Sequence, residues 1–367
     1  MNESVNLASL VVWGGFALAF VFGAIAAKTN FCTMGAISDV VNMGHWGRVR
    51  MWMLAIAVAI IGTNLLYVAG WIDLSKSLYQ RPVVPWLSLL LGGCLFGIGM
   101  TIAGGCANKN LIRLGAGSLR SLVVLVFLAI SAYMTLKGLF GQWRAGFLDP
   151  IAVDLSRWNF PTQGLPVLLS RATGLSEKTA LLITSLAFGL GLMAFVFKDG
   201  RFRKNLQQVL GSVALGLLIV AAWYLTGHIG HGENPETLET VYFATNSRTL
   251  ESLSFVAPAA YSLELMMLWT DQTLRVTFGI ATAAGVALGS LTYSLATRQF
   301  RWEGFASVED LRTQLIGAVL MGFGGVTSIG CTIGQGMSGV STLAIGSFLT
   351  LGGIIAGSVG AMKWQQR

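Results

Sequence analysis

The chain has 367 residues, of which 54% are hydrophobic and only 11% are charged, and its net charge at pH 7 is +8. A soluble domain carries about 25% charged residues, so this composition excludes a water-soluble globular protein. The basic residues lie in short segments between apolar runs, which is the positive-inside pattern of a membrane protein and not an aromatic and basic platform for nucleic acid. We therefore expect membrane lipid around the chain and no nucleic-acid partner.

Long charge-free runs follow one another along the chain. A helix needs about 20 apolar residues to cross the hydrocarbon core, and continuous runs without polar alternation exclude a β-barrel. We predict an all-α polytopic membrane protein with about nine transmembrane helices and re-entrant loops. The predicted spans lie in residues 4–27, 51–72, 82–108, 121–143, 179–197, 205–230 and 276–297, and in 313–362, which is long enough for two helices and a turn.

The charges between the runs predict how the chain lies in a cytoplasmic (inner) membrane. Segments 28–50, 111–120 and 198–204 are basic, which places them in the cytoplasm, whereas 144–178 and 231–251 are expected outside. The first run is interpreted as a retained span with its N-terminal end outside, because its leading residues carry Glu3 and no Lys or Arg. Segment 252–270 contains Pro258 and Glu264 and spans the membrane, lies flat at its surface or re-enters it; the sequence leaves these three alternatives open.

Two stretches of the chain repeat one pattern. Residues 101–115 read TIAGGCANKNLIRLG and residues 327–339 read TSIGCTIGQGMSG, so each places a cysteine directly after glycine at the end of an apolar run. A weaker correspondence joins residues 30–32 to residues 299–301. Internal duplication is typical of transporters, with the substrate site between the repeats. We predict two pseudo-symmetric repeats of the inverted type, 1–140 and 275–367, and a connecting region, 141–274, with two or three membrane segments and hydrophilic loops.

The chemistry of these stretches favours an anion. A turn rich in glycine, serine and threonine is tolerated at membrane depth only inside protein or beside a wet cavity. A helix that restarts after each cysteine presents unpaired amide groups, which attract anions. A thiol adds a weak donor and a soft, polarizable contact that matches sulfur. The candidate binding residues are Cys106, Cys331, Asn108, Lys109, Asn110, Arg113, Thr332, Gln335 and Ser338.

The four cysteines are Cys32, Cys94, Cys106 and Cys331. They form no CxxC pair and no cluster of metal ligands, so we expect no disulfide framework, no metal and no cofactor. Cys94 is interpreted as a packing residue, and packing alone remains an alternative for Cys106 and Cys331. Because no histidine lies near any cysteine in the sequence, a transporter is favoured over a membrane thiol enzyme.

Three motifs carry a family resemblance: KTNFCTMGA at 28–36, GMTIAGGCANKNLIRLG at 99–115 and GFGGVTSIGCTIGQGMSG at 322–339. The chain resembles the YeeE/YedE family of sulfur-transport membrane proteins, which includes thiosulfate transporters, over its first 140 and last 90 or so residues. The resemblance implies an hourglass of helices in which cysteines relay thiosulfate at a central constriction. Cys32, Cys106 and Cys331 occupy matching places, with Cys32 at one end of the relay. A soluble TusA-like sulfurtransferase is the cytoplasmic partner that the resemblance suggests.

Arg301 stands where the second repeat aligns with Cys32 and where the resemblance implies a further cysteine. An arginine there strengthens anion capture, together with Lys109 and Arg113, or indicates another cargo. The leading prediction is a transporter that takes up a sulfur-containing inorganic anion, thiosulfate above all. The alternatives are transport of sulfite, sulfide or a selenium species, and a thiol or sulfur-transfer protein that acts with the soluble sulfurtransferase.

Overall fold

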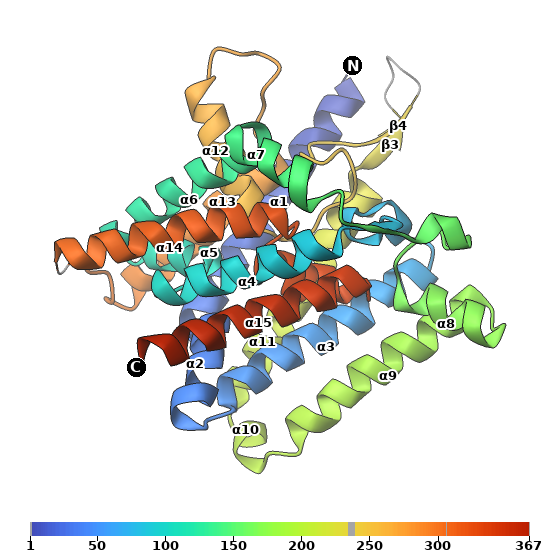
Figure 1. Cartoon of the computed structure of the whole chain (residues 1–367), viewed down its shortest axis with the longest axis horizontal. Coiled ribbons are helices and arrows are strands. Elements are labelled where there is room, and N and C mark those ends of the chain that lie inside the picture. The colour runs from blue at the N-terminus through green and yellow to red at the C-terminus, as the bar shows by residue number, and fades with distance from the viewer. Residues whose placement is uncertain (1, 234–238, 306, 367) are drawn as a thin grey trace.

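The computed structural model describes residues 2–233, 239–305 and 307–366 (Figure 1). Within these ranges the regular elements are helices apart from two small two-stranded sheets, which confirms the predicted all-α class. The α-helices are α1 Asn2–Thr29, α2 Thr33–Met43, α3 Gly47–Val68, α4 Trp86–Ile102, α5 Ala107–Gly115, α6 Leu119–Lys137, α7 Leu139–Trp143, α8 Leu165–Thr173, α9 Glu177–Phe197, α10 Gly200–Lys204, α11 Leu206–Tyr224, α12 Val256–Met267, α13 Phe278–Ala296, α14 Val308–Thr327 and α15 Ile345–Gln365.

Short elements lie in the connections between the long helices. The strands form two antiparallel pairs, β1 Val83–Val84 with β2 Val153–Asp154 and β3 His231–Glu233 with β4 Thr240–Tyr242. The other helical turns are η1 Leu74–Lys76, η2 Leu78–Gln80, η3 Arg144–Leu148, η4 Leu155–Trp158, η5 Leu225–Ile229 and η6 Gly334–Gly339.

Eight helical segments of the described chain are long and apolar enough to cross a membrane. They contain α1, α3, α4, α6, α9, α11, α13 and α15. The 20-residue α14 is the ninth long helix; its first turn carries Glu309 and Asp310, and its remainder packs between α4 and α6. The sequence predicted about nine transmembrane helices, and the eight apolar segments together with α14 make nine long helices. The 12-residue α12 is too short to span, so segment 252–270 contributes a half-helix.

Helices α4 and α14 cross at the centre of the molecule through glycine. A Cβ atom added to Gly92 would lie 2.9 Å from the carbonyl oxygen of Gly324, and one added to Gly99 would lie 2.6 Å from that of Gly317. The residue numbers in contact decrease along α14, from Gly324 to Gly317, as they increase along α4, from Gly92 to Gly99. The two helices are therefore antiparallel. Glycine is required at these positions because the backbones approach each other directly.

The helices around this crossing pack in a reciprocal pattern. α4 packs against α15 and α14 packs against α6, while α1 packs against α13 and α11 against α3 (Figure 1). The close approach is again made by glycine, since a Cβ at Gly97 would lie 2.2 Å from the Ile354 oxygen and one at Gly322 would lie 2.5 Å from the Leu128 oxygen. Each central helix is therefore clamped by the last long helix of the opposite half of the chain.

Two of the predicted cytoplasmic segments, 28–50 and 198–204, lie together on one side of the molecule. Arg50, in the first turn of α3, forms an ion pair with Asp199, the N-cap of α10. The amide nitrogen of Gln366 donates to the Asn42 oxygen at 2.7 Å, which ties the end of α15 to the end of α2. Figure 1 shows α2, α10 and the C-terminal end at one side and the N-terminal end at the other.

Candidate functional site

The first glycine-cysteine stretch is a tight turn between α4 and α5. Gly104 has a φ of +70°, which reverses the chain after α4, and Cys106 is the N-cap of α5. The Asn110 amide nitrogen donates to the carbonyl oxygens of Gly105 (3.0 Å) and Cys106 (3.1 Å), and Arg113 donates to that of Gly104 (2.8 Å). Side chains of α5 thus fold back on the turn and fix the Cys106 thiol, which is 1% exposed.

The second stretch builds an equivalent turn between α14 and η6. Ile329 and Gly330 have positive φ values of 60° and 157°, so the chain turns back immediately before Cys331. The Gln335 amide nitrogen donates to the Ser328 oxygen at 2.6 Å, and the Gly334 N–H donates to the Cys331 sulfur at 3.4 Å. The turn is buried together with Cys331, which is 0% exposed.

Cys32 lies at a third turn, between α1 and α2. It is the N-cap of α2, and its sulfur accepts a hydrogen bond from the Gly35 N–H at 3.3 Å. The Arg48 guanidinium covers Gly35 so closely that an added Cβ atom would lie 2.7 Å from its nitrogen. All three candidate cysteines therefore stand before a helical segment, whose first N–H groups have no carbonyl partner within the helix.

The structure brings the cysteine turns together. Cys106 lies within electrostatic range of both Cys32 and Cys331, and the Thr332 side chain lies beside its thiol. Lys109 interacts with Cys32 and Cys106, and its ammonium donates to the Asn30 oxygen at 2.6 Å. The sequence placed these residues in separate motifs, and the fold collects them into one site.

Buried polar atoms without a partner surround this site. A buried polar group left unpaired costs about 1–3 kcal/mol, so a cluster of such groups indicates a place for a ligand or water. Among the described residues, the side-chain oxygens near the turns that have no hydrogen-bond partner belong to Asn108, Thr327, Thr332, Gln335, Ser347 and Thr350. Four of these atoms, in the threonines and in Ser347, belong to hydroxyl groups, which are donors that suit an anion, whereas the Asn108 and Gln335 oxygens are acceptors.

An outer cavity of about 330 Å³ on the predicted external side is lined by three of these residues, Thr327, Gln335 and Ser347. Two arginines also line it, Arg81 and Arg144, of which Arg144 is paired with Asp149 at 3.4 Å. A neighbouring cavity of about 190 Å³ shares Arg144 and Tyr79 with it. These arginines were not among the predicted site residues, because their segments carried only a topological signal in the sequence.

Tyr79 stands at the inner end of the outer cavity. A Cβ atom added to Gly334 would lie 3.6 Å from its hydroxyl and 2.6 Å from that of Ser254. Burial, with the nearby Cys331 and Glu251, raises the pKa of Tyr79. Its hydroxyl therefore remains a neutral hydrogen-bond donor close to the Cys331 turn.

An inner cavity of about 330 Å³ lies on the predicted cytoplasmic side. Three arginines line it, Arg113, Arg120 and Arg301, of which Arg120 is paired with Asp310 at 3.3 Å. Arg301 is exposed, and its backbone N–H donates to the Ala116 oxygen at 3.1 Å. The predicted anion-attracting residues Arg113 and Arg301 thus line the same cavity.

A helical core crossed by polar cysteine turns, with a basic cavity at each end, is the architecture of a membrane transport protein. The chain belongs to the Sulphur transport family, whose sequence profile matches residues 28–360. Its family identifies it as a transporter and not an enzyme. It is similar to the thiosulfate transporter TsuA of Escherichia coli strain K12, at 24% identity over 340 residues, covering 89% of this chain and 87% of that protein. The thiosulfate transporter TsuA of Spirochaeta thermophila is 26% identical over 349 residues, covering 92% and 94%.

Proposed function

We propose that this protein takes up thiosulfate through the cytoplasmic membrane. The observation that carries the proposal is the meeting of Cys32, Cys106 and Cys331 in one buried site between two arginine-lined cavities. The similarity to two thiosulfate transporters over about nine-tenths of the chain supports the same cargo.

The chemistry of the ion fits the sequence of groups along this path. Arg81 and Arg144 attract the doubly charged ion into the outer cavity, where hydroxyl groups donate to its oxygens. Neutral thiols then donate weakly to its terminal sulfur, from Cys331 to Cys106 and on to Cys32. Several such contacts together hold the ion in the constriction. Because each single contact is weak, the ion can also leave it. Lys109, Asn108 and Gln335 supply polar contacts at the turns, and Arg113 and Arg301 receive the ion in the inner cavity.

We propose that two inverted repeats account for the arrangement of the site. The antiparallel crossing of α4 and α14 pairs Gly92 with Gly324 and Gly99 with Gly317, a pattern that a two-fold rotation maps onto itself. The packing also matches α1 with α11, α2 with α12 and α3 with α13. The second repeat then covers about 206–365, more than the predicted 275–367, and Cys32 corresponds to Phe255, the N-cap of α12, instead of Arg301.

A soluble TusA-like sulfurtransferase remains our proposal for the cytoplasmic partner, with the basic surface around Arg113, Arg120 and Arg301 as its contact region. Sulfite, sulfide and selenium species remain the alternative cargoes. The two polar turns contact sulfur through thiols in addition to binding oxygen, which favours thiosulfate over ions without an exposed sulfur atom.

Uptake into proteoliposomes made from the purified protein alone tests the proposal. Wild-type protein is expected to take up labelled thiosulfate, and sulfate in excess is expected to compete weakly. Cys106→Ala and Cys331→Ala should lower the rate at least tenfold, whereas Cys94→Ala, which removes the fourth thiol, should keep it. Normal uptake by both variants would refute the relay. Transport of sulfite in preference to thiosulfate would contradict the proposed cargo and assign sulfite instead.

A further inference from the structure

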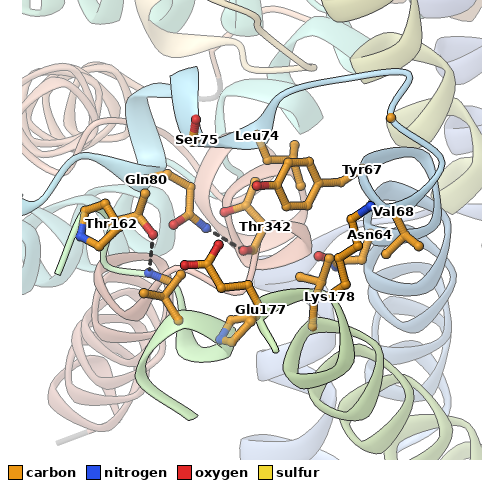
Figure 2. Close-up of a pocket in the computed structure, with 16 residues that line it drawn as sticks. Asn64, Tyr67, Val68, Leu74, Ser75, Gln80, Thr162, Glu177, Lys178 and Thr342 are labelled. Carbon is orange, nitrogen blue, oxygen red and sulfur yellow. Dashed lines mark hydrogen bonds between the residues drawn. The ribbon is translucent and has the colours of Figure 1, made fainter. Parts of the chain in front are cut away.

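A third cavity, of about 440 Å³, opens on the predicted external side and is separate from the outer cavity (Figure 2). The last turn of α3, the η1 and η2 turns, residues 161–167 and the first turn of α9 form its walls. No arginine and no cysteine of the described chain lines it. We name it the side cavity. Its wall also includes Thr342, in the segment that joins η6 to α15.

Two buried amide side chains line the side cavity, and the oxygen atoms of both are unpaired. Asn64 is 1% exposed, and its nitrogen donates to the carbonyl oxygens of Ile60 (2.7 Å) and Ser341 (2.9 Å). Gln80 is 6% exposed, and its nitrogen donates to the Thr342 oxygen at 2.6 Å. These bonds fix the orientation of both amides, and neither side-chain oxygen has a hydrogen-bond partner in the described chain. The cavity therefore offers two preorganised acceptors that lack a positive or donating group.

The side cavity is lined by one acidic and one basic side chain. The Glu177 carboxylate lines it from α9, and Figure 2 shows Glu177, Gln80 and Asn64 around the same space. Helix α3 ends there without a basic residue in its last turn, so its terminal carbonyl groups add partial negative charge, whereas the N-terminus of α9 adds partial positive charge beside Glu177. The lining cation is Lys178, which is exposed. One carboxylate with neutral oxygens suits a monovalent cation better than a divalent ion, which prefers several carboxylates.

We propose that the side cavity binds a monovalent metal cation, for which sodium is the probe, and that its occupancy supports the segment following the cysteine turn. Asn64 and Gln80 hold the backbone of Ser341 and Thr342, and Trp223 donates to the Ser341 hydroxyl at 3.1 Å. A cation on the two amide oxygens stabilises these side chains and so the segment between η6 and α15. Unwound segments and helix C-termini are the places where transporters hold coupling cations.

The functional consequence rests on the proposed uptake of thiosulfate. A membrane potential that is negative inside opposes the inward movement of a doubly charged anion. One monovalent cation that enters with the anion offsets half of this opposition. The side cavity opens to the predicted external side, where sodium is available, and the cation it binds is linked to the Cys331 turn through residues 334–342.

Cation binding is measured first, without thiosulfate, on the purified full-length protein. Sodium chloride is expected to raise the thermal unfolding midpoint above that in choline chloride of equal ionic strength. The sodium concentration for half of this effect should rise at least fivefold in Gln80→Ala and at least twofold in Glu177→Gln. Glu177 is exposed, so its variant folds even if Gln80→Ala does not. Glu233→Gln, an exposed acidic residue outside the cavity, is the matched control and should keep the wild-type value.

The outcomes separate the site from the transport proposal. Equal midpoints in sodium, potassium and choline would overturn the site, and so would a sodium effect that Glu177→Gln leaves unchanged. A thermal midpoint that changes with pH and not with the sodium concentration would show that the site binds a proton and would also overturn the sodium site. Cys106→Ala is expected to lose thiosulfate uptake and to retain the sodium effect. In wild-type proteoliposomes, replacing external sodium by choline should lower thiosulfate uptake at least fivefold; undiminished uptake would overturn the coupling.

Discussion

At the scale of single residues, the site combines thiols with hydroxyl groups that have no other partner. The Thr332 hydroxyl is the closest of these to the proposed relay, because it lies beside the Cys106 thiol and directly follows Cys331. A hydrogen bond to a charged group contributes about 1.5–3 kcal/mol. The hydroxyl is therefore in a position to hold an ion as it passes from one thiol to the next.

Thr332→Val keeps the volume of the side chain and removes the hydroxyl. We expect a roughly tenfold to hundredfold lower kcat/KM for thiosulfate uptake, which corresponds to that hydrogen-bond energy. Initial uptake rates in proteoliposomes provide the measurement. Thr292→Val removes an exposed hydroxyl bonded to the Leu288 carbonyl and should leave uptake unchanged. Equal rates for both variants would exclude Thr332 from the path.

Glu251 gives the site a pH-sensitive neighbour. Burial raises the pKa of this carboxyl above its ordinary value, against the opposing hydrogen bond from the Ser247 N–H. The cavity beside it also contains Arg144, Tyr79 and Tyr261. The folded state therefore holds the proton more tightly than the unfolded chain does. The resulting stabilisation is complete below the unfolded pKa and is lost as the pH rises through the folded pKa.

Thermal unfolding of wild type and Glu251→Gln across pH 4–8 checks this sign. Wild-type protein should gain stability on acidification towards its unfolded pKa near 4.5. Glu251→Gln has no proton to bind and should lack this component of the pH dependence, while other carboxyl groups act equally in both proteins. Parallel pH profiles of the two proteins would show that Glu251 does not contribute.

At the scale of helices, glycine decides how closely the central elements approach. A Cβ atom at Gly357 of α15 would lie 2.1 Å from the Cys94 carbonyl oxygen of α4, whereas one at Gly360 of the same helix meets no atom within 4 Å. Gly357→Ala must push the two helices apart, which we expect to cost about 1–3 kcal/mol. Gly360→Ala only improves helix propensity, by up to about 1 kcal/mol. Thermal midpoints should thus fall in the first variant and stay level or rise in the second.

The helices were largely predictable from the sequence, and the reason is the hydrocarbon solvent. Each charge-free run must be helical to satisfy its backbone, so the runs located α1, α3, α4, α6, α9, α11, α13 and α15. α14 was included in the run 313–362, although it begins earlier, at Val308, with a polar first turn. The sequence did not decide whether segment 252–270 spans the membrane, lies flat or re-enters, because a short apolar run with Pro258 fits each of these. The structure gives it a helix of 12 residues.

The candidate site was predictable only in part. The paired glycine-cysteine pattern identified Cys106 and Cys331, but the neighbours that reach them come from distant segments. Tyr79 and Arg144 were missed because a lone tyrosine or arginine in a loop carries no periodic signal, and only the tertiary packing places them at the outer cavity. Whether Arg301 replaces a relay cysteine also depends on which elements correspond, and the packing favours Phe255 as the partner of Cys32.

At the scale of the whole molecule, an uneven charge distribution surrounds a path for an anion. Moving one charge against 100 mV costs about 2.3 kcal/mol, so a dianion entering a cell meets about 4.6 kcal/mol per 100 mV. The basic residues of the inner cavity lower the energy of the arriving ion, but they do not remove this cost. Uptake against a gradient therefore requires an energy source, and in our proposal the cation of the side cavity supplies part of it, about 2.3 kcal/mol per 100 mV.

The orientation of the molecule is itself testable. The eight apolar segments and α14 make an odd number of crossings, so the start of α1 and the end of α15 lie on opposite sides. Gln366 is bonded to Asn42, next to the basic connection between α2 and α3, which the positive-inside rule places in the cytoplasm. A fluorescent protein fused after residue 367 should therefore fluoresce, and alkaline phosphatase fused there should be inactive. Phosphatase inserted after residue 232, between α11 and α12, should be active, whereas the opposite pair of results would invert the outer and inner cavities and reverse the direction of our uptake path.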